Sequence, residues 1–222
     1  MPTSAMPPTH DQGEARASDR FVAHVMRLCE DSRTRSDLRT GLGLPVERCN
    51  RMHRYLARRL SEGLHRDARR AYYGVAALIA AQPPHVYRSS AQQADCQLQE
   101  PLLQRRERSN LGASLAGGVN GGILRPGTAE SHLHLFSRQS SDALHERLPA
   151  LTRHLLDGGV NVDWGVLLED LTWWNRSRDV RVTRWMETYY RAVNEETDDV
   201  DDKAKEGINV QPIENAYSTE EI

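Results

Sequence analysis

The chain has 222 residues, a formal net charge of −2 and 38% hydrophobic residues, which suggests one or two domains with a sizeable buried core. Its three cysteines have no CxxC spacing, so they indicate neither a disulfide framework nor a zinc finger. No run of 18 apolar residues occurs and the first residues lack the order of a secretion signal, so we expect a cytoplasmic protein without a membrane partner.

The expected elements of the first third of the chain are helices. Residues 1–17, which contain three prolines, are predicted to be a disordered lead. A first helix is expected to begin at Ser18, because apolar residues then recur at helical spacing. A short turn of helix over 36–41 and a helix that begins at Pro45 follow. A longer helix over 66–82 is expected to end at a pair of prolines.

The helical pattern fails in the middle of the chain. Residues 85–108 are polar and interrupted by a proline, so we predict a mobile loop there. A short helix over 109–116 is followed by a glycine-rich connector over 117–127, which we take as the domain boundary. The chain is therefore divided into an N-terminal helical domain over 18–125, which includes the loop, and a C-terminal helical bundle over 126–194.

The C-terminal third also lacks strands. Thr128 and Ser141 are expected to cap two helices, and Asp163 a third. Strand-like alternation of useful length is absent from the whole sequence. The predicted fold class is therefore all-α, with two small helical bundle domains joined by the glycine-rich connector.

Two adjacent tryptophans follow the helix that Asp163 begins. At about 100° per residue, Trp174 falls in the apolar stripe that starts at Trp164, whereas Trp173 falls on the back of the helix. One tryptophan therefore serves the core, and the other must meet a second surface, which is either another part of this chain or a partner. We predict Trp173 to be a protein-interface residue.

Charge is distributed unevenly along the chain. Residues 195–222 carry ten acidic residues and two lysines, a net charge of −8, and are predicted to be a disordered acidic tail. The preceding residues have 27 basic residues, all arginine, and a net charge of +6. A GC-rich genome explains an arginine bias without any function, whereas phosphate binding explains it because a guanidinium grips phosphate in a bidentate way. Both explanations remain open at this point.

Arginines gather around the start of the last helix, which is expected to begin near Asp179. Acidic residues at the spacing that would pair with them within the helix are few, so ion pairing within the helix does not account for them. We therefore predict phosphate binding by the arginines of this region: Arg176, Arg178, Arg181 and Arg184.

Indications of catalysis are weak. His132 and His134 lie about 200° apart on a helix and cannot hold one metal ion. The stretch "GGVNGG" lacks the lysine and hydroxyl residue of a P-loop. Three carboxylates that a nuclease could use, Glu130, Glu169 and Asp170, are scattered. We expect no catalytic residue, no metal and no cofactor, and therefore no enzyme.

Several segments carry a resemblance to a known family. With "LRTGLG" in the first third, "SNLGASLA" in the middle and "VDWGVLLEDLTWW" near the end, the chain resembles the CasB family over residues 19–194. CasB is the small subunit of Cascade, the type I-E CRISPR surveillance complex. The resemblance implies a two-domain, non-catalytic helical protein of antiviral defence. It would stabilise the pairing of guide RNA with target DNA, and the displaced strand, by binding nucleic-acid backbone.

Partners and site residues are implied by the same resemblance. The partners would be guide RNA, target DNA, the backbone and large subunits of Cascade, and a second copy of this chain. The chain departs from the family at Ala113, where a base is common. From the residues alone, a helical protein-interaction scaffold without direct nucleic-acid binding remains the alternative. Basic positions of the family match eight arginines: Arg39, Arg106, Arg108, Arg153, Arg176, Arg178, Arg181 and Arg184.

Overall fold

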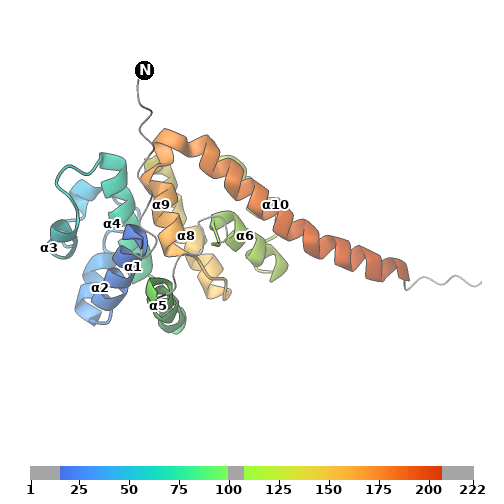
Figure 1. Ribbon diagram of the computed structural model, residues 1–222, viewed down its shortest axis with the longest axis horizontal. Coiled ribbons are helices and arrows are strands. Elements are labelled where there is room, and N and C mark those ends of the chain that lie inside the picture. Colours follow the sequence, from blue (N-terminus) through green and yellow to red (C-terminus); the bar gives the residue numbers. More distant parts are fainter. Residues whose placement is uncertain (1–15, 100–107, 207–222) are drawn as a thin grey trace, which may run out of the picture.

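The computed structural model is a helical body from which one long helix projects (Figure 1). It describes residues 16–99 and 108–206. No strand occurs in these two ranges, and the predicted all-α fold class is confirmed. None of the helices described combines the length and the apolar character that crossing a membrane requires.

The elements follow one another along the chain with short connections. They are α1 (Ala17–Leu28), α2 (Ser32–Arg39), the 3-10 turn η1 (Val46–Arg48), α3 (His53–Leu56), the 3-10 turn η2 (Ala57–Arg59), α4 (Arg66–Ala80), α5 (Pro84–Gln99), α6 (Leu111–Asn120), α7 (Pro126–Phe136), α8 (Ser141–Asp157), α9 (Trp164–Thr172) and α10 (Trp174–Glu206).

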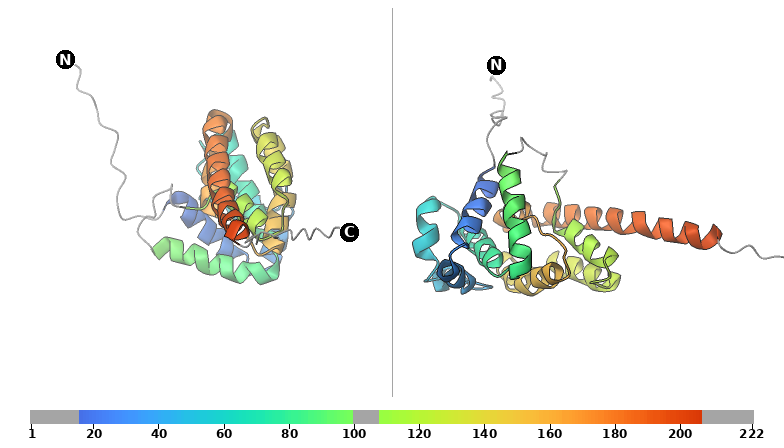
Figure 2. Two further views of the ribbon diagram at one scale, coloured as in Figure 1. Left: turned by 90° about the vertical axis from the view of Figure 1, so that its right-hand side faces the viewer. Right: turned by 90° about the horizontal axis from the view of Figure 1, so that it is seen from below.

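One continuous cluster of buried apolar side chains runs through the body. Helix α1 packs on α5 and α9, and α4 packs on α2, α8 and α9. Helices α6 and α7 lie along the first part of α10, whose last turns extend beyond the body (Figures 1 and 2). The buried cluster crosses the predicted boundary at residue 125, so the division into two domains remains a prediction.

Helix α5 corrects the predicted mobile loop over 85–108. Residues 84–99 are helical, and α5 packs along α1 with Val86 and Ala94 buried. The sequence indicated a loop because this helix has a narrow apolar face and is otherwise polar. Tertiary contact with α1 therefore overrides a weak local pattern. Residues 100–107 lie outside the described residues.

The glycine-rich connector over 117–127 is helical in its first part, because α6 continues through Asn120. A side chain at Gly118 would bring its Cβ within 2.9 Å of the Leu155 side chain on α8. This glycine allows two helices to approach closely, which differs from the flexible joint that we expected.

Helix α10 also differs from the expectation for the acidic tail over 195–222. It continues to Glu206, so residues 195–206 are helical. A helix that has already formed extends at little cost, because each further residue adds a hydrogen bond without a new nucleus. The rest of the tail, 207–222, and residues 1–15 of the predicted lead lie outside the described residues.

The two adjacent tryptophans divide as the periodicity predicted. Trp174 is fully buried and stacks near Trp185, with ring centroids 5.1 Å apart. Its indole N–H donates to the Gln139 carbonyl at 3.0 Å. Trp173, the C-cap residue of α9, is 45% exposed. In this structure the back of α9 is therefore left uncovered at Trp173.

His145 lies in the contact between α8 and α4. Its ring is buried, and its Nδ1 lies 2.7 Å from the Ser141 carbonyl, which can only accept a hydrogen bond. The ring faces Gly74, where a Cβ would come within 2.5 Å of it. Burial lowers the pKa of His145 to about 4, and the nearby Arg70 lowers it further.

We predict that acid destabilises the protein through His145. The folded pKa of about 4 lies below the ordinary value of 6.5, so the unfolded chain takes up the proton first as the pH falls. The stability that neutral His145 confers is complete above about pH 6.5 and is lost progressively toward pH 4. The loss should be on the order of 3 kcal/mol, measured by urea unfolding across this range.

The matched variant is His145→Asn, which keeps a donor for the Ser141 carbonyl but has no proton to gain in this range. Its unfolding free energy should be lower at neutral pH and should change less between pH 6.5 and 4. An equally steep loss in the variant would show that other groups cause the acid sensitivity.

Candidate nucleic-acid interface

Arg108 occupies a buried ion-pair network that joins three parts of the chain. Its Nη1 donates to both carboxylate oxygens of Asp19 on α1 at 2.9 Å. Its Nε and Nη2 donate to Asp163, the N-cap residue of α9, at 2.8 and 2.6 Å. The three side chains are only 4–7% exposed. A Cβ at Gly165 would come within 2.2 Å of Asp19, so the backbone of α9 closes over this network.

The network balances burial against charge pairing. Burial raises the pKa of Asp19, and the guanidinium of Arg108 opposes that rise. Asp163 also accepts the Val166 backbone N–H at 3.0 Å, so the same carboxylate caps α9 and holds Arg108. A polynucleotide phosphate cannot reach a guanidinium in this position. This corrects the predicted role of Arg108, which stabilises the fold instead of contacting nucleic acid.

Arg181 is held inside in a similar way. Its Nη1 lies 3.3 Å from Asp170, and the two side chains are 15% and 1% exposed. Asp170 also accepts the indole N–H of Trp185 at 2.8 Å. Arg181 therefore ties α10 to α9, and its charge is already matched by a buried carboxylate. Arg184, one turn further along, is half-buried and lines an open groove on α10 with Val180.

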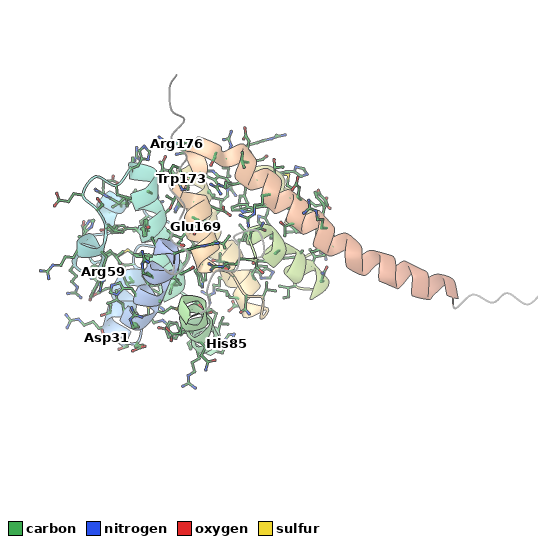
Figure 3. All side chains as sticks on the ribbon, in the orientation of Figure 1. Asp31, Arg59, His85, Glu169, Trp173 and Arg176 are labelled. Carbon is green, nitrogen blue, oxygen red and sulfur yellow. The ribbon has the colours of Figure 1, made fainter. Side chains whose placement is uncertain are left out.

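Two of the predicted arginines stay at the surface beside Trp173. Ser177 has non-helical backbone angles, so the chain turns between α9 and the long part of α10. We call Trp173, Arg176 and Arg178 the α9–α10 corner (Figure 3). The Arg176 guanidinium lies 5.5 Å from the centroid of the Trp173 ring. Arg178 is 38% exposed and pairs with the exposed Asp179 at 3.4 Å.

The remaining predicted arginines lie on other elements. Arg39 is exposed at the end of α2 and forms no ion pair with another described residue. Arg153 on α8 is 78% exposed and pairs with Asp157 at 3.5 Å. Arg106 lies outside the described residues. Since α2 and the start of α10 lie apart in Figure 1, the predicted set does not form one continuous surface.

A second basic surface was missed by the sequence analysis. Arg27 on α1 and Arg59 on η2 both lower the pKa of His24, after the effect of burial, which places the three groups near one another. Arg58 is exposed on the same turn as Arg59. We call these four residues the α1–η2 patch. The sequence does contain a usable signal, because residues 48–61 hold five arginines and no acidic residue.

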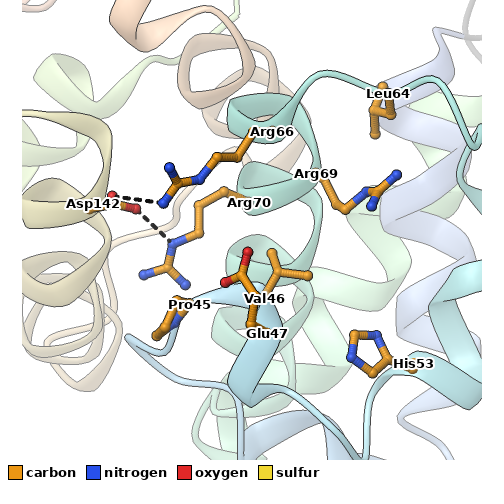
Figure 4. A pocket seen from close by; sticks show the side chains of 9 residues that line it. All are labelled: Pro45, Val46, Glu47, His53, Leu64, Arg66, Arg69, Arg70 and Asp142. Atoms are coloured by element: carbon orange, nitrogen blue, oxygen red, sulfur yellow. Dashed lines mark ion pairs between the residues drawn. The ribbon is translucent and has the colours of Figure 1, made fainter.

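A cavity of about 410 Å³ lies between η1 and the starts of α4 and α8 (Figure 4). Arg66 and Arg70 lie 3.7 and 3.6 Å from the carboxylate of Asp142. Arg70 also donates to the Gly43 carbonyl at 3.0 Å. Asp142 thus neutralises part of the positive charge in this cavity, which makes it a weaker candidate for polynucleotide binding than the α9–α10 corner or the α1–η2 patch.

The described residues offer no metal site, since no group of three histidine, cysteine, aspartate or glutamate side chains lies together in this part of the chain. Two carboxylates named for a nuclease are engaged in packing. Asp170 is held by Trp185 and Arg181, and Glu169 accepts the Ser18 hydroxyl at 2.8 Å. What the exposed arginines can do is contact anions without chemistry.

Comparisons with known proteins point to one family. The family model for CRISPR-associated protein Cse2 matches residues 34–190. A chain of a CRISPR RNA-guided surveillance complex is 32% identical, with a TM-score of 0.68, over 83% of this chain and 97% of that chain. A chain of such a complex before nicking has the same identity and coverage and a TM-score of 0.71.

A crystal structure of CasB from M. ruber is similar in fold. It is 24% identical, with a TM-score of 0.66, over 83% of this chain and 98% of that chain. No curated protein sequence matches the chain significantly. The likeness to solved structures therefore extends over most of the described helices.

We predict that Arg108→Ala lowers the free energy of unfolding by about 3–5 kcal/mol, because it leaves two carboxylates buried without a cation. The matched control is Arg153→Ala, whose exposed pair with Asp157 contributes little. Chemical denaturation of both variants measures the difference. If Arg108→Ala is as stable as the control, Arg108 is not the structural residue described above.

Proposed function

The chain belongs to the CRISPR-associated Cse2 family, which the sequence resemblance identified as CasB, and we propose that it is a subunit of a Cascade-type CRISPR surveillance complex. The observation that carries this proposal is the family match over residues 34–190. The fold shared with chains of RNA-guided surveillance complexes at 32% identity supports it. In antiviral defence such a subunit would act in the cytoplasm, where the complex meets invading DNA.

Within this complex, the chain binds nucleic-acid backbone through exposed arginines. The α9–α10 corner and the α1–η2 patch supply guanidinium groups that reach solvent, and contacts to phosphate require no particular base. In RNA-guided recognition, base pairing reads the sequence while the protein stabilises a nearly balanced strand exchange. The chain would therefore stabilise the pairing of guide RNA with target DNA and hold the displaced strand.

Its partners are the backbone and large subunits of the complex and a second copy of itself. The family resemblance supports these partners, and the surveillance complexes among the similar structures fit them. The role requires no catalysis, because arginines that contact phosphate and stabilise an assembly are sufficient for it. The engagement of Glu169 and Asp170 in packing supports a non-catalytic subunit.

A helical protein-interaction scaffold without direct nucleic-acid binding is the second candidate. It is favoured by the internal pairing of Arg108 and Arg181, which removes two of the predicted phosphate contacts. It is also consistent with the position of Arg39 and Arg153 on separate helices. The two candidates differ in whether the isolated chain has a salt-dependent affinity for single-stranded nucleic acid.

We predict that the full chain binds single-stranded DNA with an affinity that falls steeply with salt concentration, as measured by fluorescence anisotropy. Each phosphate contact contributes a slope of about 0.7 in a plot of log affinity against log salt. The double substitution Arg176→Gln and Arg178→Gln should weaken binding to all sequences and reduce this slope by about 1.4. Helicity should stay unchanged, since both side chains reach solvent.

The matched control is Arg191→Gln, which removes an exposed arginine of the same helix that pairs with Glu187. It should change the slope less than the double variant. Binding that is absent or independent of salt would favour the scaffold. Cleavage of the strand after Mg²⁺ or Mn²⁺ is added would contradict the non-catalytic assignment.

A further inference from the structure

Trp173 is unusual among the four tryptophans of the chain. Trp164, Trp174 and Trp185 are at most 4% exposed, whereas Trp173 is 45% exposed. No hydrogen bond joins its indole N–H to another residue of the described ranges. A large aromatic side chain gains much of its favourable free energy from burial, so an exposed indole indicates a surface that something else covers.

The surroundings of Trp173 are charged and polar. Arg176 lies over the ring and forms no ion pair with another described residue. Asn175 is exposed beside it, and the next exposed large apolar residue, Val180, lies seven residues further along the chain. No broad apolar patch therefore surrounds this ring, as Figure 3 shows for the labelled corner.

This pattern suits a nucleobase better than a protein side chain. A tryptophan that anchors a protein interface usually lies among other apolar groups that exclude water. Proteins that hold single strands instead combine an aromatic platform with nearby cations, because the base stacks while its phosphates meet the positive charge. The acidic groups at the corner do not cancel this charge, since Asp179 pairs with Arg178 and Glu169 lies near Arg16.

We propose that Trp173 is a stacking platform for an unpaired nucleobase of single-stranded nucleic acid, with Arg176 and Arg178 on the neighbouring phosphates. This role depends on the proposed nucleic-acid binding and adds to it a contact with the base. A protein partner on Trp173, as the sequence analysis predicted, is the competing occupant. The face of the ring away from Arg176 and the exposed edge are the surfaces that a base would use.

The experiment compares two strands that carry equal charge. The full chain is titrated with oligothymidylate and with an abasic strand of the same length, at low salt. Oligothymidylate should bind more tightly. Trp173→Ala should lower its affinity about 5- to 150-fold, the range for one stacked base, and leave the abasic affinity unchanged. Trp173→Phe should keep part of the preference, because it retains an aromatic face.

Val180→Ala is the matched control, because it shortens a 67% exposed apolar side chain near the same corner that has no aromatic face. It should change neither affinity. Tryptophan fluorescence gives a second readout, since Trp173 is the exposed indole and a stacked base quenches it. Oligothymidylate should quench the wild-type emission, the abasic strand should not, and Trp173→Phe should lose the quenching.

The outcomes separate the platform from the proposed function. If both strands bind equally and Trp173→Ala alters neither affinity, the platform is wrong while backbone binding stands, and a protein partner becomes the better occupant. If neither strand binds in a salt-dependent way, both the platform and the proposed nucleic-acid binding fail.

Discussion

The structure depends on a guanidinium group that has left water and lies between two buried carboxylates. Removing such charges from water is costly, so the arrangement is stable only because Arg108 meets Asp19 and Asp163 in four short hydrogen bonds. These bonds join α1, the segment before α6 and the start of α9. Since α9 leads directly to Trp173, the network also sets the position of the α9–α10 corner, where nucleic acid is proposed to bind.

Much of the fold follows from local patterns in the sequence. Asp163 caps α9 as expected, and the stripe from Trp164 to Trp174 is buried because a helix presents residues of that spacing on one face. Helix α5 could not be predicted in this way, since its stability depends on contact with α1 and its own sequence is largely polar. The extension of α10 to Glu206 was likewise hidden by its acidic composition.

The candidate site was harder to predict, because a sequence shows how many arginines there are but not what they meet. The test applied to them, acidic residues one turn away, covers pairs within a helix only. Arg108 pairs with carboxylates 55 and 89 residues away, and Arg181 with one on the preceding helix. The exposure of Trp173 was one of two outcomes that the helical periodicity allowed. The acid-free run over 48–61 was visible and pointed to the α1–η2 patch.

The central claim is that buried arginines hold the fold while exposed arginines bind nucleic acid. Hydrogen exchange of the full chain, with and without a saturating single strand, tests it most directly. The account predicts slower exchange on binding at residues 173–178, with no change at 163–166 or in α1, where the Arg108 network already protects the amides. Protection gained at 163–166 and in α1, with none at 173–178, would contradict it.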